Sequence, residues 1–141
     1  FPDVDRAEEP IICITVKDHA RKSILVFGCG NFVNDRDDVR YIRCSTERDL
    51  VQKFTEFWTS YNPDIVTGWN VKFFDMPYLM NRFRRLMGDE YLLQFSPWGV
   101  VTQQSARITA KGFNKEQKYW DIMGVATLDY LDLYRKQLIL N

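Results

Sequence analysis

The segment from residue 46 to residue 68 constrains the fold more than any other stretch of the chain. It opens with Thr46-Glu47-Arg48-Asp49, which has the form of a helix-capping box. Apolar residues then recur at the spacing of one helical face, namely Leu50, Val51, Phe54, Phe57 and Trp58. The pattern predicts a helix that ends at Asn62-Pro63, followed by a short buried strand over 64–68 that closes on Gly68.

Three runs rich in β-branched and aromatic residues precede this helix, over residues 10–17, 23–29 and 39–44. Turn-like stretches separate them, so we interpret the three runs as an antiparallel three-stranded unit. Residues 1–9 are acidic and show no periodicity, which is typical of a connecting loop.

The chain after Gly68 predicts further alternation of helices and strands. A second helix is expected from about Met76 to Met87, with Gly88 as its stop and with Leu79, Phe83 and Leu86 facing the core. Next come a short helix within 89–98, two polar-alternating strands within 100–124 around Lys111-Gly112, and a helix over 126–138. Strands first and alternation afterwards indicate an α/β or α+β fold with helices packed on a mixed sheet, a class that includes the ribonuclease H-like architecture.

Composition favours one folded domain over the 141 residues and excludes several classes of protein. Lys plus Arg and Asp plus Glu both number 19, so any nucleic-acid contact must come from a local patch. Three cysteines without CxxC spacing and a single histidine exclude a disulfide framework and a zinc site, and fit a reducing cytosol. No apolar run approaches the roughly 18 residues of a membrane span, and the opening Phe1-Pro2-Asp3 predicts a piece of a longer chain.

The most informative stretch is NPDIVTGWNVKFFDMPYL at 62–79. It resembles the second exonuclease motif of family B DNA polymerases, in which a strand ends in Gly-Trp-Asn or Gly-Tyr-Asn and Asn-x-x-x-Phe-Asp opens the next helix. Asn70, Phe74 and Asp75 fill those positions. The likeness covers roughly 46–98 and 120–136, and the LDYLDLY segment at 128–134 is similar to polymerases of the T-even bacteriophage type.

The resemblance implies a ribonuclease H-like 3'-5' proofreading exonuclease domain of a DNA-directed DNA polymerase. The implied chemistry is hydrolysis of the 3'-terminal phosphodiester of DNA by two divalent ions, Mg²⁺ or Mn²⁺, which four carboxylates hold. Asp75 matches the catalytic, metal-binding carboxylate of the second motif. Asn70 and Phe74 match contacts to a single-stranded 3' primer end, and the implied location is the cytoplasm of a phage-infected host cell.

Two of the family's three carboxylate motifs are not found in these 141 residues. The first, Asp-x-Glu on the first, central strand, would precede Phe1, and the third, Tyr-x-x-x-Asp, is not found by the end of the predicted last helix. We therefore expect 1–141 to be one partial domain, the central part of the exonuclease, that binds no metal and is inactive alone. Without the first strand, the strand at 64–68 and the 10–44 unit would each have an unpaired edge, which favours self-association or a rearranged sheet.

Each site residue also has a structural interpretation. Asp75 followed by Pro77 is a common helix N-cap arrangement, and Gly68-Trp69-Asn70 suits an Asx-turn. Phe74 is by default a core residue. Asp129 and Asp132, at i,i+3 spacing near Arg135 and Lys136, suggest surface ion pairs more than metal ligation. Scattered basic residues suggest a solvated face and are left outside the site, namely Arg82, Arg84, Arg85, Lys111, Lys115 and Lys118.

Three hypotheses for function follow. The first is the polymerase-linked proofreading exonuclease. The second is a noncatalytic nucleic-acid-binding or interaction module that keeps a ribonuclease H-like fold, and the third is a stand-alone repair exonuclease. An Asp-x-Glu encoded just before Phe1 would favour an exonuclease over the noncatalytic module.

Overall fold

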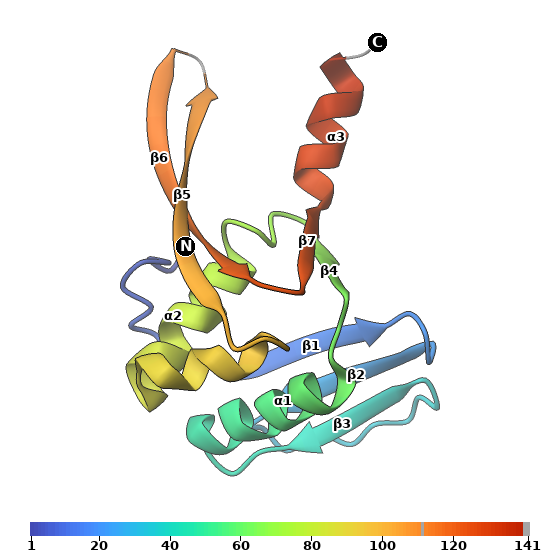
Figure 1. Cartoon of the computed structure of the whole chain (residues 1–141). Helices are drawn as coiled ribbons and strands as arrows, with labels where there is room; N and C mark the ends of the chain where they lie inside the picture. Colours follow the sequence, from blue (N-terminus) through green and yellow to red (C-terminus); the bar gives the residue numbers. More distant parts are fainter. Residues whose placement is uncertain (111, 140–141) are drawn as a thin grey trace. The chain divides into compact units, whose positions relative to one another are not determined.

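The computed structural model describes residues 1–110 and 112–139, and it has the predicted mixed α/β composition (Figure 1). Two compact units are distinguished, one of Glu9–Tyr61 and one of Phe1–Glu8 with Asn62–Asn141. Within the described residues, no helix is both long and apolar enough to cross a bilayer.

The Glu9–Tyr61 unit is a three-stranded sheet with one helix packed on it (Figure 1). Its elements are β1 (Cys13–Asp18), β2 (Ser23–Gly28), β3 (Val39–Arg43) and α1 (Glu47–Tyr61), and β2 is the central strand. The ring of Phe27 on β2 is 1% exposed and lies edge-on to Phe54 of α1, with 5.6 Å between ring centroids. Aromatic packing of this kind joins the helix to the sheet.

Helix α1 confirms the prediction made from its capping residues and apolar period. The backbone N–H of Asp49 donates to Thr46 Oγ1 at 3.1 Å, the bond expected of a helix N-cap. Leu50 and Val51 are fully buried, and Phe57 is half-buried. Local signals were therefore sufficient to define this helix.

The prediction that the first three strands are all antiparallel is wrong for the last of them. β1 and β2 are antiparallel, but β3 runs parallel to β2, with Ile24 opposite Val39 and Gly28 opposite Arg43. The connection over 29–38 is long enough to return the chain to the start of β2 before β3 begins. β-branched composition predicts strands but carries no information on their direction.

The second unit contains the remaining helices and strands. They are β4 (Ile65–Gly68), α2 (Asp75–Met87), the 3-10 helix η1 (Asp89–Phe95), β5 (Val101–Ala110), β6 (Phe113–Ile122), β7 (Ala126–Asp129) and α3 (Tyr130–Ile139). β5 and β6 confirm the two strands predicted within 100–124, and they pair antiparallel. Lys111, near which the prediction placed the connection, lies outside the described residues. Gly88 ends α2, as its position predicted.

Residues 126–138 were predicted to be helical throughout, which is wrong for the first four. Those four residues form β7, which pairs in parallel with β4 so that Ile65 lies opposite Ala126 and Gly68 opposite Asp129 (Figure 1). The pairing joins segments about sixty residues apart. A local periodicity therefore could not indicate it, although the rest of the segment is helical as predicted.

The buried face of α2 differs from the predicted one. Phe83 is fully buried as expected, but Leu79 and Leu86 are only half-buried. Met76 and Met80 take their place, at 6% and 0% exposure. Arg82 is also buried, because it hydrogen-bonds the main chain of residues 7 and 8.

The described strands form three separate hydrogen-bonded sheets, β1-β2-β3, β4-β7 and β5-β6. In the part of the chain that the structure describes, β4 is thus paired with β7 and belongs to no five-stranded sheet. Self-association through strand edges stays a prediction.

Candidate functional site

A tight turn connects the end of β4 to the start of α2. The N–H groups of Phe73 and Phe74 donate to the carbonyl of Asn70 at 3.3 and 3.0 Å, and Asn70 itself adopts a left-handed φ of 58°. A Cβ on Gly68 would lie 3.2 Å from Cβ of Val71, a closer approach than side chains normally allow. The glycine therefore lets the chain fold back directly after the strand.

Asp75 is the first residue of α2 and is exposed to solvent. The N-cap position belongs to Phe74, with no side-chain capping bond, so the interpretation of Asp75 as an N-cap is wrong. Asp75 stands one residue too late in the chain to cap the helix. Its carboxylate is therefore not used to cap the helix.

Two effects raise the pKa of the Asp75 carboxyl above its ordinary value. The larger is partial desolvation by neighbouring atoms, and the smaller is the negative charge of Asp129. A hydrogen bond from its own backbone N–H opposes them without cancelling them. Folding thus holds a carboxylate where its ionised form is disfavoured, a situation common at functional sites.

We expect Asp75→Asn to stabilise the chain slightly at neutral pH. The pKa of Asp75 is higher in the folded than in the unfolded state, so the free energy of unfolding falls as pH rises through the two pKa values. Asparagine carries no charge and therefore avoids this loss of stability. The gain should be complete above the raised pKa of folded Asp75 and vanish below the ordinary Asp pKa of about 3.9. Thermal unfolding at pH 3.5 and pH 7 measures it, and an equal effect at both values would contradict the prediction.

Asp129 is a buried residue beside this turn whose position the sequence pattern did not reveal. Its side chain is 5% exposed, and its carboxylate accepts backbone N–H groups from Asn70 at 2.9 Å, Lys72 at 3.0 Å and Leu131 at 2.9 Å. The prediction that Asp129 forms a surface ion pair is therefore wrong. An aspartate directly before a helical run is a signal for an N-cap, and this signal could have found it.

Asn70, Phe74 and Asp75 are brought together by the one turn that carries them. Asn70 is half-buried on the turn. The half-buried ring of Phe74 packs edge-on to Phe1 at 6.0 Å and stacks with Tyr78 at 6.5 Å between centroids. These contacts fit the core interpretation of Phe74, and its contact with a nucleotide stays a prediction.

The segment Phe1–Glu8 is held against α2 by side chains that donate to its carbonyl groups. Asn81 Nδ2 donates to Val4 O at 2.8 Å, and Arg82 Nη1 donates to Ala7 O at 3.1 Å and Glu8 O at 2.8 Å. Burial of Arg82 contradicts its assignment to a solvated face. This segment is irregular, as predicted, yet it is anchored by specific hydrogen bonds.

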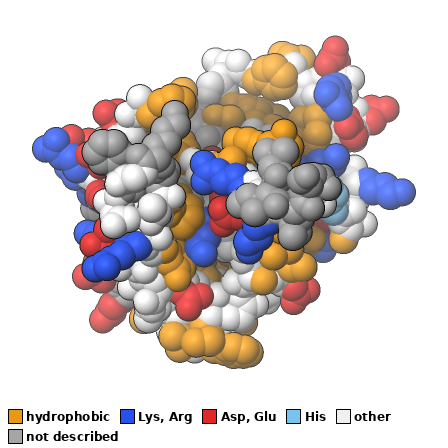
Figure 2. Space-filling model, turned by 90° about the horizontal axis from the view of Figure 1, so that it is seen from above, with side chains coloured by type: hydrophobic (Ala, Val, Ile, Leu, Met, Phe, Trp, Pro, Cys, Tyr) orange, Lys and Arg blue, Asp and Glu red, His pale blue; other side chains and the backbone are white. Residues whose placement is uncertain are grey.

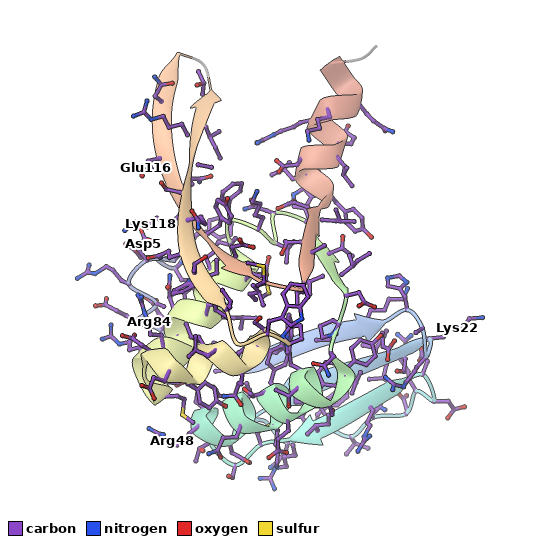
Figure 3. All side chains as sticks on the ribbon, in the orientation of Figure 1. Asp5, Lys22, Arg48, Arg84, Glu116 and Lys118 are labelled. Atoms are coloured by element: carbon purple, nitrogen blue, oxygen red, sulfur yellow. The ribbon has the colours of Figure 1, made fainter. Side chains whose placement is uncertain are left out.

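Charged side chains of both signs lie on the surface of the described residues. On the face seen in Figure 2, basic and acidic side chains are interspersed, in line with 19 of each in the sequence. Glu116 and Lys118 project from the same side of β6, two residues apart on a strand (Figure 3). The guanidinium carbon of Arg84 lies 5.3 Å from the centroid of the Trp120 ring, so this cation contacts an aromatic side chain of the same unit.

The side chains that the structure describes bring few potential metal ligands together. Among residues 1–110 and 112–139, no group of three or more His, Cys, Asp or Glu side chains could hold an ion. Asp75 offers exposed hard oxygen atoms of the kind that Mg²⁺ and Mn²⁺ prefer, whereas both oxygens of Asp129 already accept hydrogen bonds. The residues present therefore fit one position of a divalent-metal site.

The fold and the site define an α/β domain with one available carboxylate at the opening of a helix. A family model described as the exonuclease domain of DNA polymerase family B matches residues 1–141. The chain belongs to this family.

Relatives support the same assignment. The chain is 37% identical over 105 residues to a DNA-directed DNA polymerase of Enterobacteria phage T4, covering 74% of the chain and 11% of that protein. It is 31% identical over 101 residues to a DNA-directed DNA polymerase of Escherichia phage RB69, covering 71% of the chain and 11% of the relative. A DNA polymerase delta catalytic subunit of Caenorhabditis elegans is 31% identical over 94 residues, or 65% of the chain and 9% of the relative. The chain thus spans about a tenth of the length of the curated relatives it matches.

Proposed function

We propose that the chain is the central part of the proofreading 3'-5' exonuclease domain of a DNA-directed DNA polymerase and acts on the single-stranded 3' primer end of DNA. The observation that carries the proposal is the exposed carboxylate of Asp75 on the first turn of α2, with its raised pKa, in a chain of this family. The cytoplasm of a phage-infected host cell is the location that suits the phage relatives.

In this proposal Asp75 is one carboxylate ligand of a divalent-metal site, and the other ligands come from parts of the polymerase outside residues 1–141. A divalent ion such as Mg²⁺ or Mn²⁺, if held there, would supply the Lewis-acid chemistry for activating water and stabilising a leaving oxygen. The chain's own residues position the reactants: Asp75 presents its carboxylate, and Asn70 and Phe74 contact the terminal nucleotide. An aromatic side chain such as Phe74 offers a face on which a base can stack.

The isolated 141-residue chain is expected to release no nucleotides from a single-stranded 3' end, since one carboxylate cannot organise two metal ions. An end-labelled oligonucleotide incubated with the chain and Mg²⁺ or Mn²⁺ measures this, with the intact polymerase as the positive control. Robust digestion by the chain that Asp75→Ala abolishes would contradict the proposed sharing of ligands.

A further inference from the structure

Asp129 joins three parts of the second unit through one carboxylate. It is the last residue of β7 and lies opposite Gly68, the last residue of β4, in the parallel pairing. Oδ1 accepts the N–H groups of Asn70 and Leu131, and Oδ2 accepts the N–H of Lys72. The single side chain therefore caps α3 and fixes the turn after β4.

The turn that Asp129 fixes is the one that presents the proposed site. Asn70 holds a left-handed conformation that non-glycine residues rarely adopt, and its carbonyl accepts the N–H groups of Phe73 and Phe74. The Val71 carbonyl in turn accepts the N–H of Met76, inside the first turn of α2. Movement of the backbone at 70–72 would thus move the start of the helix on which Asp75 lies.

Burial makes the interaction strong and leaves Asp129 little capacity for other ligands. At 5% exposure the carboxylate is shielded from solvent, and charge-assisted hydrogen bonds to backbone N–H groups strengthen in such surroundings. With three donors on two oxygens, its position suits a support for the site and not a direct contact with the substrate.

We propose that Asp129 is a positioning residue for the exonuclease reaction: it fixes the turn over 69–74 so that Asn70, Phe74 and Asp75 meet the terminal nucleotide and the metal ions in one geometry. This inference rests on the proposed function. Partners that orient metal ligands commonly contribute about 10–100-fold to metal affinity or activity.

The test uses Asp129→Asn in the intact polymerase. Asparagine keeps one acceptor oxygen but replaces the other with an N–H₂ group, so at least one of the three bonds is lost. We expect backbone amide exchange in 69–74 to accelerate by about tenfold or more, since amides exchange faster where local structure opens. We also expect the Mg²⁺ midpoint of the exonuclease to rise, or its kcat to fall, by about 10–100-fold, with primer extension preserved.

Three control variants separate positioning from general destabilisation and from failure of the proposed function. Asp132→Asn, on the first turn of the same helix, should leave amide exchange in 69–74 and exonuclease kinetics unchanged. Thr67→Val removes the hydroxyl bond from Thr67 to Leu128 O, which links β4 to β7 without touching the turn. Asp75→Asn tests the exonuclease assignment itself.

The proposed role of Asp129 would be overturned, and the proposed function would stand, if Asp75→Asn loses activity while Asp129→Asn changes neither amide exchange in 69–74 nor kinetics. An equal change in Mg²⁺ dependence in Thr67→Val would also overturn the proposed role of Asp129, since the effect would then be a general loosening. Full activity in Asp75→Asn would instead contradict the proposed function. If Asp129→Asn does not fold, Asp129→Ser replaces it, because serine keeps a capping oxygen for α3 but lacks the second acceptor. The same results would then support or overturn the proposal.

Discussion

Replacing Asp75 with asparagine in the intact polymerase is expected to lower the 3'-5' exonuclease rate by more than about 100-fold, because a metal ligand contributes several kcal/mol to stabilising charge in the transition state. Primer extension should stay within about twofold, since we propose that polymerisation uses a different active site. The substitution keeps the shape of the side chain, removes its charge and replaces one acceptor oxygen with an N–H₂ group. Release of labelled nucleotide from a single-stranded oligonucleotide and extension of a matched primer are measured in the same preparation.

Asp132→Asn is the matched control for this experiment. It makes the same chemical change at a half-buried position of the first turn of α3, to which no contact with substrate is assigned. Both activities should be unchanged in this variant. Equal loss of the two activities in Asp75→Asn would contradict the assignment of Asp75 to an exonuclease site.

Truncation of Phe83 to alanine should destabilise the chain by about 3–5 kcal/mol, the range for emptying a fully buried aromatic site. Phe83 is fully buried on the face of α2, and its ring lies 5.7 Å from that of Phe95 on η1. The packing it provides holds the helix that begins at Asp75. Urea unfolding followed by tryptophan fluorescence and circular dichroism measures the loss.

Leu79→Ala provides the comparison on the same helix. Leu79 is half-buried, so removing its side chain returns less apolar area to water and leaves a smaller cavity. We expect it to cost clearly less than Phe83→Ala. Equal costs for the two variants would show that α2 is not packed through the face described above.

The sequence predicted best those elements whose signals are local. Thr46, the apolar period of α1 and the stop at Gly88 act within one or two turns of chain, and the structure confirms them. Segment 126–129 looked helical because LDYLDLY alone fits a helix. Its strand conformation depends on β4, about sixty residues away, and the parallel direction of β3 depends on the path of 29–38.

The candidate site was predicted only where its residues lie close together in the sequence. Asn70, Phe74 and Asp75 were selected because they lie in one contiguous string, and they do share one turn. Asp129 was assigned to a surface ion pair because a helix was predicted there, with Arg135 and Lys136 nearby. Only the pairing of β7 with β4 places its carboxylate beside the N–H groups of Asn70 and Lys72, and no local pattern encodes that pairing.

The claim that Asp75 supplies a metal ligand of the exonuclease site can be tested by anomalous diffraction from crystals of the intact polymerase soaked in Mn²⁺. Mn²⁺ prefers oxygen ligands, so we expect an anomalous peak within about 2.0–2.6 Å of an Asp75 carboxylate oxygen, the range of hard-cation coordination. The peak should be absent in Asp75→Asn crystals soaked identically. Manganese peaks that lie elsewhere, with none in coordination distance of Asp75 in the unsubstituted enzyme, would contradict the claim.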